Sequence, residues 1–223
     1  MADKKINPED GQWVTIKGRH VFIKDGESLE DALKRDSKDT ANKNEDVKNK
    51  QIAQNALRRA VDKFEDDIRN QSYETAGMFD AEGNLILNKD GEKSSVYFTD
   101  EEQLKVKNTP DCVFTHNHPS GNGFSFEDLF FAVNLEVREM RACHKNGYYS
   151  LTRQYEWGDS VPARYLDFPA AFKQAKLDYC KNVVDDIYNK TFDADLCNKM
   201  VFDHNKEWIK KNAEYYGWKY KEG

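Results

Sequence analysis

The chain has 223 residues and a net charge of −6, with 33% charged and 38% hydrophobic residues. This length suits one good-sized domain or a small domain with helical additions, and the low apolar content implies much solvated helix surface or flexible segment. The acidic balance argues against a nucleic acid partner. No apolar run approaches the roughly 20 residues of a membrane span, and the first residues lack the apolar core of a Sec-type signal peptide, so we expect no membrane association.

The cysteines are spread along the chain and form no C-x-x-C pair; they are Cys112, Cys143, Cys180 and Cys197. This spacing suits neither a zinc knuckle nor a dense disulfide framework. We expect reduced, mostly buried thiols and a cytoplasmic protein.

The first part of the chain predicts a hairpin followed by a helix. Apolar and polar residues alternate on both sides of a turn at 17–19, which indicates a β-hairpin within an N-terminal segment 1–35. Residues 36–50 have almost no apolar content, so we expect a flexible charged linker or a poorly ordered helix start. Apolar residues then recur at three- and four-residue intervals over 51–71, which predicts an amphipathic helix packed on a sheet.

The middle of the chain predicts a sheet with short helices. β-prone segments bounded by turns predict strands at 73–79, 85–88, 96–98, 112–115, 138–143 and 148–153. A Thr99-x-x-Glu102 capping box begins a brief helix, and Ser125 begins another that runs to about Val137. From about Phe168 the chain looks helical to the end, with a break near Thr191. The apolar stripe of the last helix is Trp208, Ile209, Ala213 and Tyr216.

Two histidines after the 112–115 strand are candidate metal ligands. His116 and His118 point to the same side of an extended chain, because side chains repeat every second residue. Asp128, in the first turn of the next helix, follows a loop that can fold back toward them. Two imidazoles and one carboxylate suit Zn²⁺ and leave a fourth position open, as in a catalytic site, where the ion makes water acidic near neutral pH.

Hydrolysis also needs a proton carrier and a donor for the oxyanion. Glu74, early in its strand, is the candidate general acid/base, and Ser125 is the candidate oxyanion donor. Alone, each feature has a simpler interpretation: a surface H-x-H, an ordinary N-cap, an exposed strand carboxylate. Their combination is more specific. The remaining histidines, His20, His144 and His204, are expected to be surface or packing residues.

The segments His116-Asn117-His118-Pro119-Ser120-Gly121 and Ser125-Phe126-Glu127-Asp128 resemble the signature of JAB/MPN (JAMM) metalloproteins, especially their RadC-like members. The stretch 73–86 resembles the glutamate strand and hairpin of that family. The resemblance covers about residues 50–154, and the flanking hairpin and helical tail resemble JAB-like segments of phage head-morphogenesis (Mu F-like) proteins. One difference is that nine residues, rather than the usual ten, separate His118 from Asp128.

The resemblance implies an α/β domain with a mixed, mostly antiparallel sheet flanked by helices. We expect an N-terminal hairpin segment 1–35, a linker 36–50, the metal-binding domain 51–160 and a C-terminal helical extension 161–223. The implied activity is that of a zinc-dependent peptidase or isopeptidase of phage or prophage origin, acting on a protein or peptide. His116, His118 and Asp128 would be ligands, Glu74 the acid/base and Ser125 the oxyanion donor.

Two other function classes remain open. The same metal centre could serve a nuclease or effector, against which the acidic balance argues. Alternatively, the chain is a phage-derived binding or assembly module with a degenerate site, whose C-terminal helices bind a protein partner; the shortened loop motivates this class. The oligomeric state is not fixed by the sequence.

Overall fold

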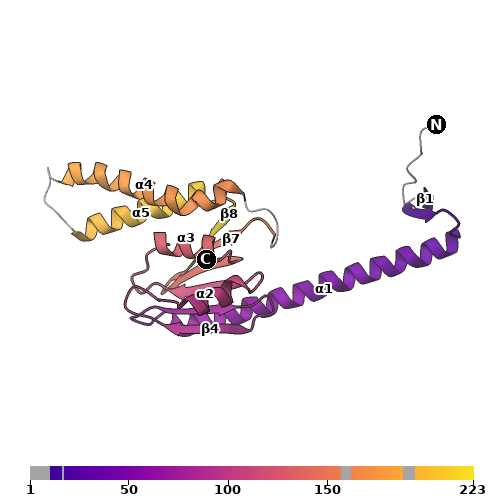
Figure 1. The fold of residues 1–223 in the computed structure, drawn as a ribbon, viewed down its shortest axis with the longest axis horizontal. Helices are drawn as coiled ribbons and strands as arrows, with labels where there is room; N and C mark the ends of the chain where they lie inside the picture. The colour runs from indigo at the N-terminus through magenta and orange to yellow at the C-terminus, as the bar shows by residue number, and fades with distance from the viewer. Residues whose placement is uncertain (1–10, 17, 157–161, 188–193) are drawn as a thin grey trace. The chain divides into compact units, whose positions relative to one another are not determined.

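The computed structural model describes residues 11–16, 18–156, 162–187 and 194–223 (Figure 1). The chain is of the mixed α/β class, as expected, and divides into two compact units, Met1–Ile52 and Ala53–Gly223. The boundary falls close to the expected start of the metal-binding domain at residue 51. Among the described helices, none combines the length and the apolar character that crossing a bilayer requires.

The first unit contains the expected hairpin, formed by β1 (Gly11–Ile16) and β2 (Arg19–Lys24) in antiparallel register. Helix α1 (Leu29–Ile68) follows and continues into the second unit. Arg35 ties the start of this helix to the hairpin, because its guanidinium pairs with Glu27 at 2.9 Å and donates to the carbonyl oxygen of Phe22.

The expectation of a flexible linker at residues 36–50 was wrong, because these residues lie inside α1. Their side chains are exposed from residue 37 onward. A helix that has already nucleated gains one hydrogen bond for each residue it adds, so it propagates through a polar segment without an apolar face. Low apolar content therefore signalled a lack of packing partners rather than a lack of helix.

The second unit is built on a six-stranded sheet with the order β4-β3-β5-β6-β7-β8. Every neighbouring pair is antiparallel except β5 and β6, so the sheet is mixed and mostly antiparallel, as expected. The strands are β3 (Thr75–Phe79), β4 (Leu85–Asp90), β5 (Val113–Asn117), β6 (Glu139–His144), β7 (Gly147–Arg153) and β8 (Trp218–Glu222).

Helices cover both faces of this sheet. Val113 of β5 packs with Phe79 and the α1 residue Val61, whereas the next residue, Phe114, faces the large core that contains Leu129 of α3. Successive strand residues point to opposite faces, so α1 and α3 lie on opposite sides. Gly77 lies directly under α1: a Cβ there would lie 2.6 Å from the Phe64 ring, so any larger residue would have to displace that ring. The other helices are α2 (Asp100–Lys107), α3 (Phe126–Asn134), α4 (Ala163–Ile187) and α5 (Ala194–Asn212).

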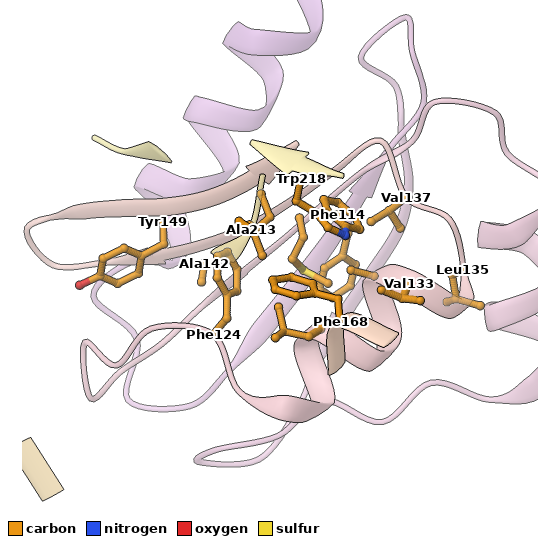
Figure 2. Packing of buried hydrophobic residues seen from close by; sticks show 14 of the residues in the cluster. Phe114, Phe124, Val133, Leu135, Val137, Ala142, Tyr149, Phe168, Ala213 and Trp218 are labelled. Atoms are coloured by element: carbon orange, nitrogen blue, oxygen red, sulfur yellow. The ribbon is translucent and has the colours of Figure 1, made fainter. Parts of the chain in front are cut away.

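The C-terminal segment is part of the same compact unit as the sheet. Figure 2 shows Phe168 of α4 and Trp218 of β8 in one core with Phe114 and Val133. The expectation of helix to the chain end was wrong at β8. Helix α5 ends at Asn212, and after a turn that includes Gly217 with a φ of +83°, Trp218 pairs with Arg153 of β7.

One further sequence expectation is wrong, and another falls on residues that the structure does not describe. Residues 96–98 are not a strand, because their backbone pairs with no neighbouring strand in the described chain. Phe98 instead turns its ring onto Phe114 and Phe131, at centroid distances of 5.7 and 5.3 Å. The expected break near Thr191 lies outside the described residues.

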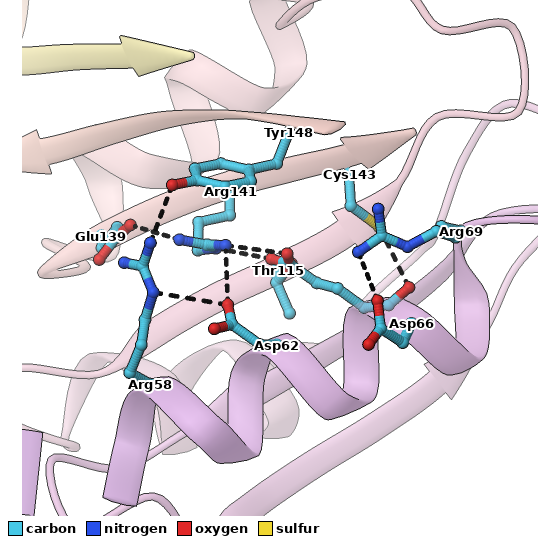
Figure 3. A network of polar contacts seen from close by, with 10 residues as sticks. Arg58, Asp62, Asp66, Arg69, Thr115, Glu139, Arg141, Cys143 and Tyr148 are labelled. Carbon is cyan, nitrogen blue, oxygen red and sulfur yellow. Dashed lines mark hydrogen bonds and ion pairs between the residues drawn. The ribbon is translucent and has the colours of Figure 1, made fainter. Parts of the chain in front are cut away.

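The α1 face of the sheet holds a buried polar network (Figure 3). Arg141 of β6 donates to both carboxylate oxygens of Glu65 at 2.6 and 2.9 Å, and both side chains are 1% exposed. Thr115 also donates to Glu65, at 2.7 Å, and the Tyr148 ring lies 3.9 Å from the Arg141 guanidinium. Because these groups come from α1, β5, β6 and β7, the network fixes the helix against the strand that carries the candidate histidines.

Candidate metal centre

The end of β5 brings the two candidate histidines together. His116 lies on the α3 face, opposite Ala76 of β3, and His118 follows the strand by one residue. Both side chains are buried, and their Nε2 atoms are 2.7 Å apart. The expectation that both imidazoles point to the same side is therefore confirmed.

Asp128 is brought to the histidines by the start of α3. Ser125 is the N-cap: its Oγ accepts from the N–H of Asp128, and the Asp128 carboxylate accepts from the N–H of Ser125 at 2.7 Å. This capping box holds the carboxylate so that one oxygen lies 3.1 Å from His116 Nε2 and the other lies 3.6 Å from His118 Nε2. The three candidate ligand atoms lie within 4.8 Å of one another, so a loop of nine residues is long enough.

The protonation of the cluster suits a cation. His118 Nδ1 lies 2.6 Å from the carbonyl oxygen of Asn122, so this nitrogen carries the proton and Nε2 presents its lone pair. Burial and the neighbouring His116 lower the pKa of His118. Burial disfavours the charged form of Asp128, but the two histidines outweigh it and lower the pKa of the carboxyl. Burial also opposes protonation of His116, yet Asp128 raises its pKa.

These residues fit a divalent metal ion. Imidazole nitrogen and carboxylate oxygen are ligands for Zn²⁺. A bound ion would displace the proton that Asp128 stabilises on His116. The Nδ1–H of His118 bonded to a backbone carbonyl is the outer contact that such histidine ligands usually make. His116, His118 and Asp128 thus form a group that could hold a metal ion.

Glu74 lies beside this group. Glu74 precedes β3 by one residue, and His118 follows β5 by one residue. When the antiparallel register of β3 and β5 is continued by these residues, Glu74 and His118 lie opposite each other. Its backbone N–H donates to the Glu92 carbonyl, and its own carbonyl accepts from Gly91, both at 2.8 Å. The side chain is half-buried, and desolvation raises the pKa of its carboxyl to about 7; Asp128 adds to this shift and His116 opposes it.

One pocket of about 800 Å³ contains the whole arrangement. Glu74, the two histidines, Ser125 and Asp128 all line it. Residues 94–98, part of which the sequence predicted as a strand, and the aromatic residues Phe126, Phe130 and Phe131 of α3 line it as well. Polar lining residues also include Ser94, Ser95, Gln103, Ser120, Asn122, Glu127 and Asn134.

The other histidines lie elsewhere, as predicted. His20 is exposed on the hairpin and hydrogen-bonds to Thr15. His144 stacks on Tyr149 at 4.9 Å, and His204 stacks on Tyr179 at 3.9 Å. None of them belongs to the metal-binding group.

No protein-family model, curated protein or solved structure matches the chain. The assignment of the site therefore depends on its geometry and on the motifs in the sequence.

Proposed function

We propose that the protein is a zinc-dependent hydrolase of the JAB/MPN (JAMM) type that cleaves a peptide or isopeptide bond. One observation carries the proposal: a buried group of His116, His118 and Asp128 shares a pocket with Glu74, a carboxyl whose pKa is raised to about 7. A structural ion would need no such neighbour, whereas a hydrolase needs a proton carrier that works near neutral pH.

Each residue has a role that its environment supports. His116, His118 and Asp128 would hold the ion, which when bound supplies Lewis acidity toward water and toward a substrate carbonyl. Glu74 accepts a proton from the attacking water and returns it to the leaving amine, for which a pKa near 7 is suited. Ser125 uses its Oγ as an acceptor from Asp128, so its hydroxyl hydrogen remains available to an oxyanion.

The order of the parts along the chain supports the JAMM assignment. Glu74 lies immediately before β3, the H-N-H-P-S-G segment begins at the end of the neighbouring antiparallel strand β5, and an S-x-x-D cap begins the helix that follows. The mixed sheet with helices on both faces agrees with the fold that the motif implies.

The pocket disfavours a phosphodiester substrate. None of the described residues that line it is lysine or arginine, while Glu74, Glu127 and Asp128 are acidic. Nucleic acid binding depends on cations that neutralise phosphates. A neutral amide bond suits this lining better.

The first experiment measures bound zinc by plasma mass spectrometry in protein purified without chelator. We expect near-stoichiometric zinc in the wild type and little in the His116→Ala/His118→Ala double variant. His20→Ala, which removes an exposed histidine outside the pocket, is the matched control and should keep its zinc. Wild-type protein that takes up no zinc even when it is offered would refute the proposal.

Activity is then tested on peptide and isopeptide libraries with the zinc-loaded protein. Cleavage by the wild type and its loss in Glu74→Gln, with zinc retained, is the expected result. Zinc binding without any Glu74-dependent cleavage would instead identify a binding module that keeps the metal site.

A further inference from the structure

The pocket beside the metal centre is a groove with aromatic walls. Residues 94–98 form one wall and α3 forms the other. The floor comes from β5, where Phe114 precedes His116 by two residues and their rings are 5.3 Å apart. The apolar surface therefore runs directly up to a candidate ligand.

The floor rings are locked together. Phe114 contacts Phe98 from one wall and Phe131 from the other, at centroid distances of 5.7 and 4.7 Å, and Phe98 and Phe131 are 5.3 Å apart. Three rings held by one another form a rigid surface, because none can move without losing contacts with two neighbours.

The rims of the two walls carry exposed aromatic side chains. Tyr97 is 69% exposed and Phe130 is 53% exposed, and both line the groove. Phe126, one helical turn before Phe130, stacks with it at 5.8 Å. Large apolar groups that gather around a concave surface indicate a binding site, whereas scattered ones do not.

The charge of the groove restricts its occupant further. Its acidic lining residues are Glu74, Asp128 and the exposed Glu127, with no lysine or arginine among the described lining residues. Lys173 contacts the Phe126 ring at 4.8 Å but is not part of the lining. An acidic segment would be repelled, whereas a neutral or basic one would be tolerated or attracted.

We propose that this groove selects an extended peptide segment with a large aromatic or aliphatic side chain next to the cleaved bond and with no acidic residue beside it. The proposal depends on the proposed function, because it takes the metal centre as the point at which the substrate carbonyl binds. Tyr97 and Phe130 are then residues that determine specificity, and the side chain of the substrate lies between them above the ring of Phe131.

The test uses zinc-loaded wild-type protein and three N-acetylated amino acid hydroxamates, whose zinc-binding group is constant while the side chain varies. Binding is measured by calorimetry for the phenylalanine, glycine and aspartate compounds. We expect the phenylalanine hydroxamate to bind at least about tenfold more tightly than the glycine compound, because the ring is removed from water, and the aspartate compound to bind most weakly.

The variant Tyr97→Ala/Phe130→Ala should reduce the preference for phenylalanine over glycine to less than about threefold while its zinc content is unchanged. Both residues are exposed, so we expect the variant to fold. Tyr215→Ala, which removes a 62% exposed tyrosine that does not line the groove, is the control and should retain the full preference.

The outcomes separate the two proposals. Three results, each obtained with protein that takes up zinc, would overturn the groove inference and leave the metal centre intact. They are equal affinity for the phenylalanine and glycine hydroxamates, no hydroxamate binding at all, and a preference for phenylalanine that survives Tyr97→Ala/Phe130→Ala. Failure to take up zinc, which is measured before any hydroxamate is added, would overturn the proposed function and the inference with it.

Discussion

Asn117 accepts a hydrogen bond from the backbone N–H of Thr75 at 2.6 Å, and its Nδ2 donates to the carbonyl oxygen of Tyr73 at 2.9 Å. The side chain is buried and lies on the sheet face opposite to its neighbours His116 and His118. It therefore holds the backbone on both sides of Glu74. The residue between the two candidate ligands thus fixes the position of the candidate acid/base relative to them.

Asn117→Ala should leave the buried N–H of Thr75 and the carbonyl of Tyr73 without their partners, which lowers the free energy of unfolding by about 2 kcal/mol. Urea denaturation measures this loss. Hydrogen exchange shows where in the chain the loss of stability acts. We expect the exchange rate of the Thr75 amide to increase more than the rates of amides in the middle of β3, such as that of Met78. Equal acceleration along the strand would mean that Asn117 stabilises the fold generally and does not hold Glu74 in particular.

The buried pair of Glu65 and Arg141 gives a second prediction. Glu65→Ala removes the main partner of a guanidinium that is 1% exposed, and an uncompensated buried charge costs about 3–5 kcal/mol. Asp66→Ala is the matched control from the same helix turn. Its pair with Arg69 at 2.7 Å has a 71% exposed carboxylate, so we expect a loss below about 1 kcal/mol in the same urea experiment. Similar losses in the two variants would show that Glu65 is not essential to the network.

The metal-binding group could be predicted from the sequence because its residues follow local rules. Strand alternation places His116 and His118 on one side, and the capping box places Asp128 at the first turn of α3. Neither rule depends on distant parts of the chain. The hairpin and the strands β3 to β7 were likewise predicted from alternation and turn residues.

The features that could not be predicted depend on long-range contacts. Residues 96–98 have the composition of a strand, but no strand of the described chain pairs with them, and they form a wall of the pocket instead. The sequence pattern before Gly217 is helical, so helix was predicted for the residues of β8 as well. Their strand conformation depends on pairing with β7, which lies more than 60 residues earlier in the chain. The role of Asn117 depends on the register between β3 and β5, which sequence patterns do not give.

The pKa of Glu74 predicts how the stability of the metal-free protein changes with pH. Its ordinary value is 4.5 and desolvation raises it to about 7 in the folded state. Between these values the folded state holds a proton that the unfolded state releases, so the free energy of unfolding falls as the pH rises through this window. Glu74→Gln removes that fall. With chelator present, we expect the variant to be more stable than the wild type by about 1–2 kcal/mol at pH 8 and equally stable below pH 4.5. The value at pH 8 is smaller than the full pKa shift implies, because solvent screens the half-exposed side chain.

Glu127→Gln serves as the control for that measurement, because Glu127 is an exposed acid that lines the same pocket. Its effect should stay within about 0.5 kcal/mol at either pH. A Glu74→Gln variant whose advantage is the same at pH 8 and pH 4.5 would show that the carboxyl of Glu74 does not titrate between these values.

The capping box at Ser125 gives the last prediction, because it links helix stability to metal affinity. Ser125→Ala removes the acceptor for the Asp128 N–H and should cost about 1 kcal/mol of folding stability. Thr99→Ala removes the equivalent cap of α2, where Thr99 and Glu102 form the same reciprocal contacts, and should cost a similar amount. Only the Ser125 variant loosens the carboxylate next to the histidines, so only its zinc dissociation constant, measured by competition with a fluorescent chelator, should increase. An increase of equal size in Thr99→Ala would indicate that zinc affinity follows overall stability, and no increase in either variant would show that Asp128 keeps its position without the cap.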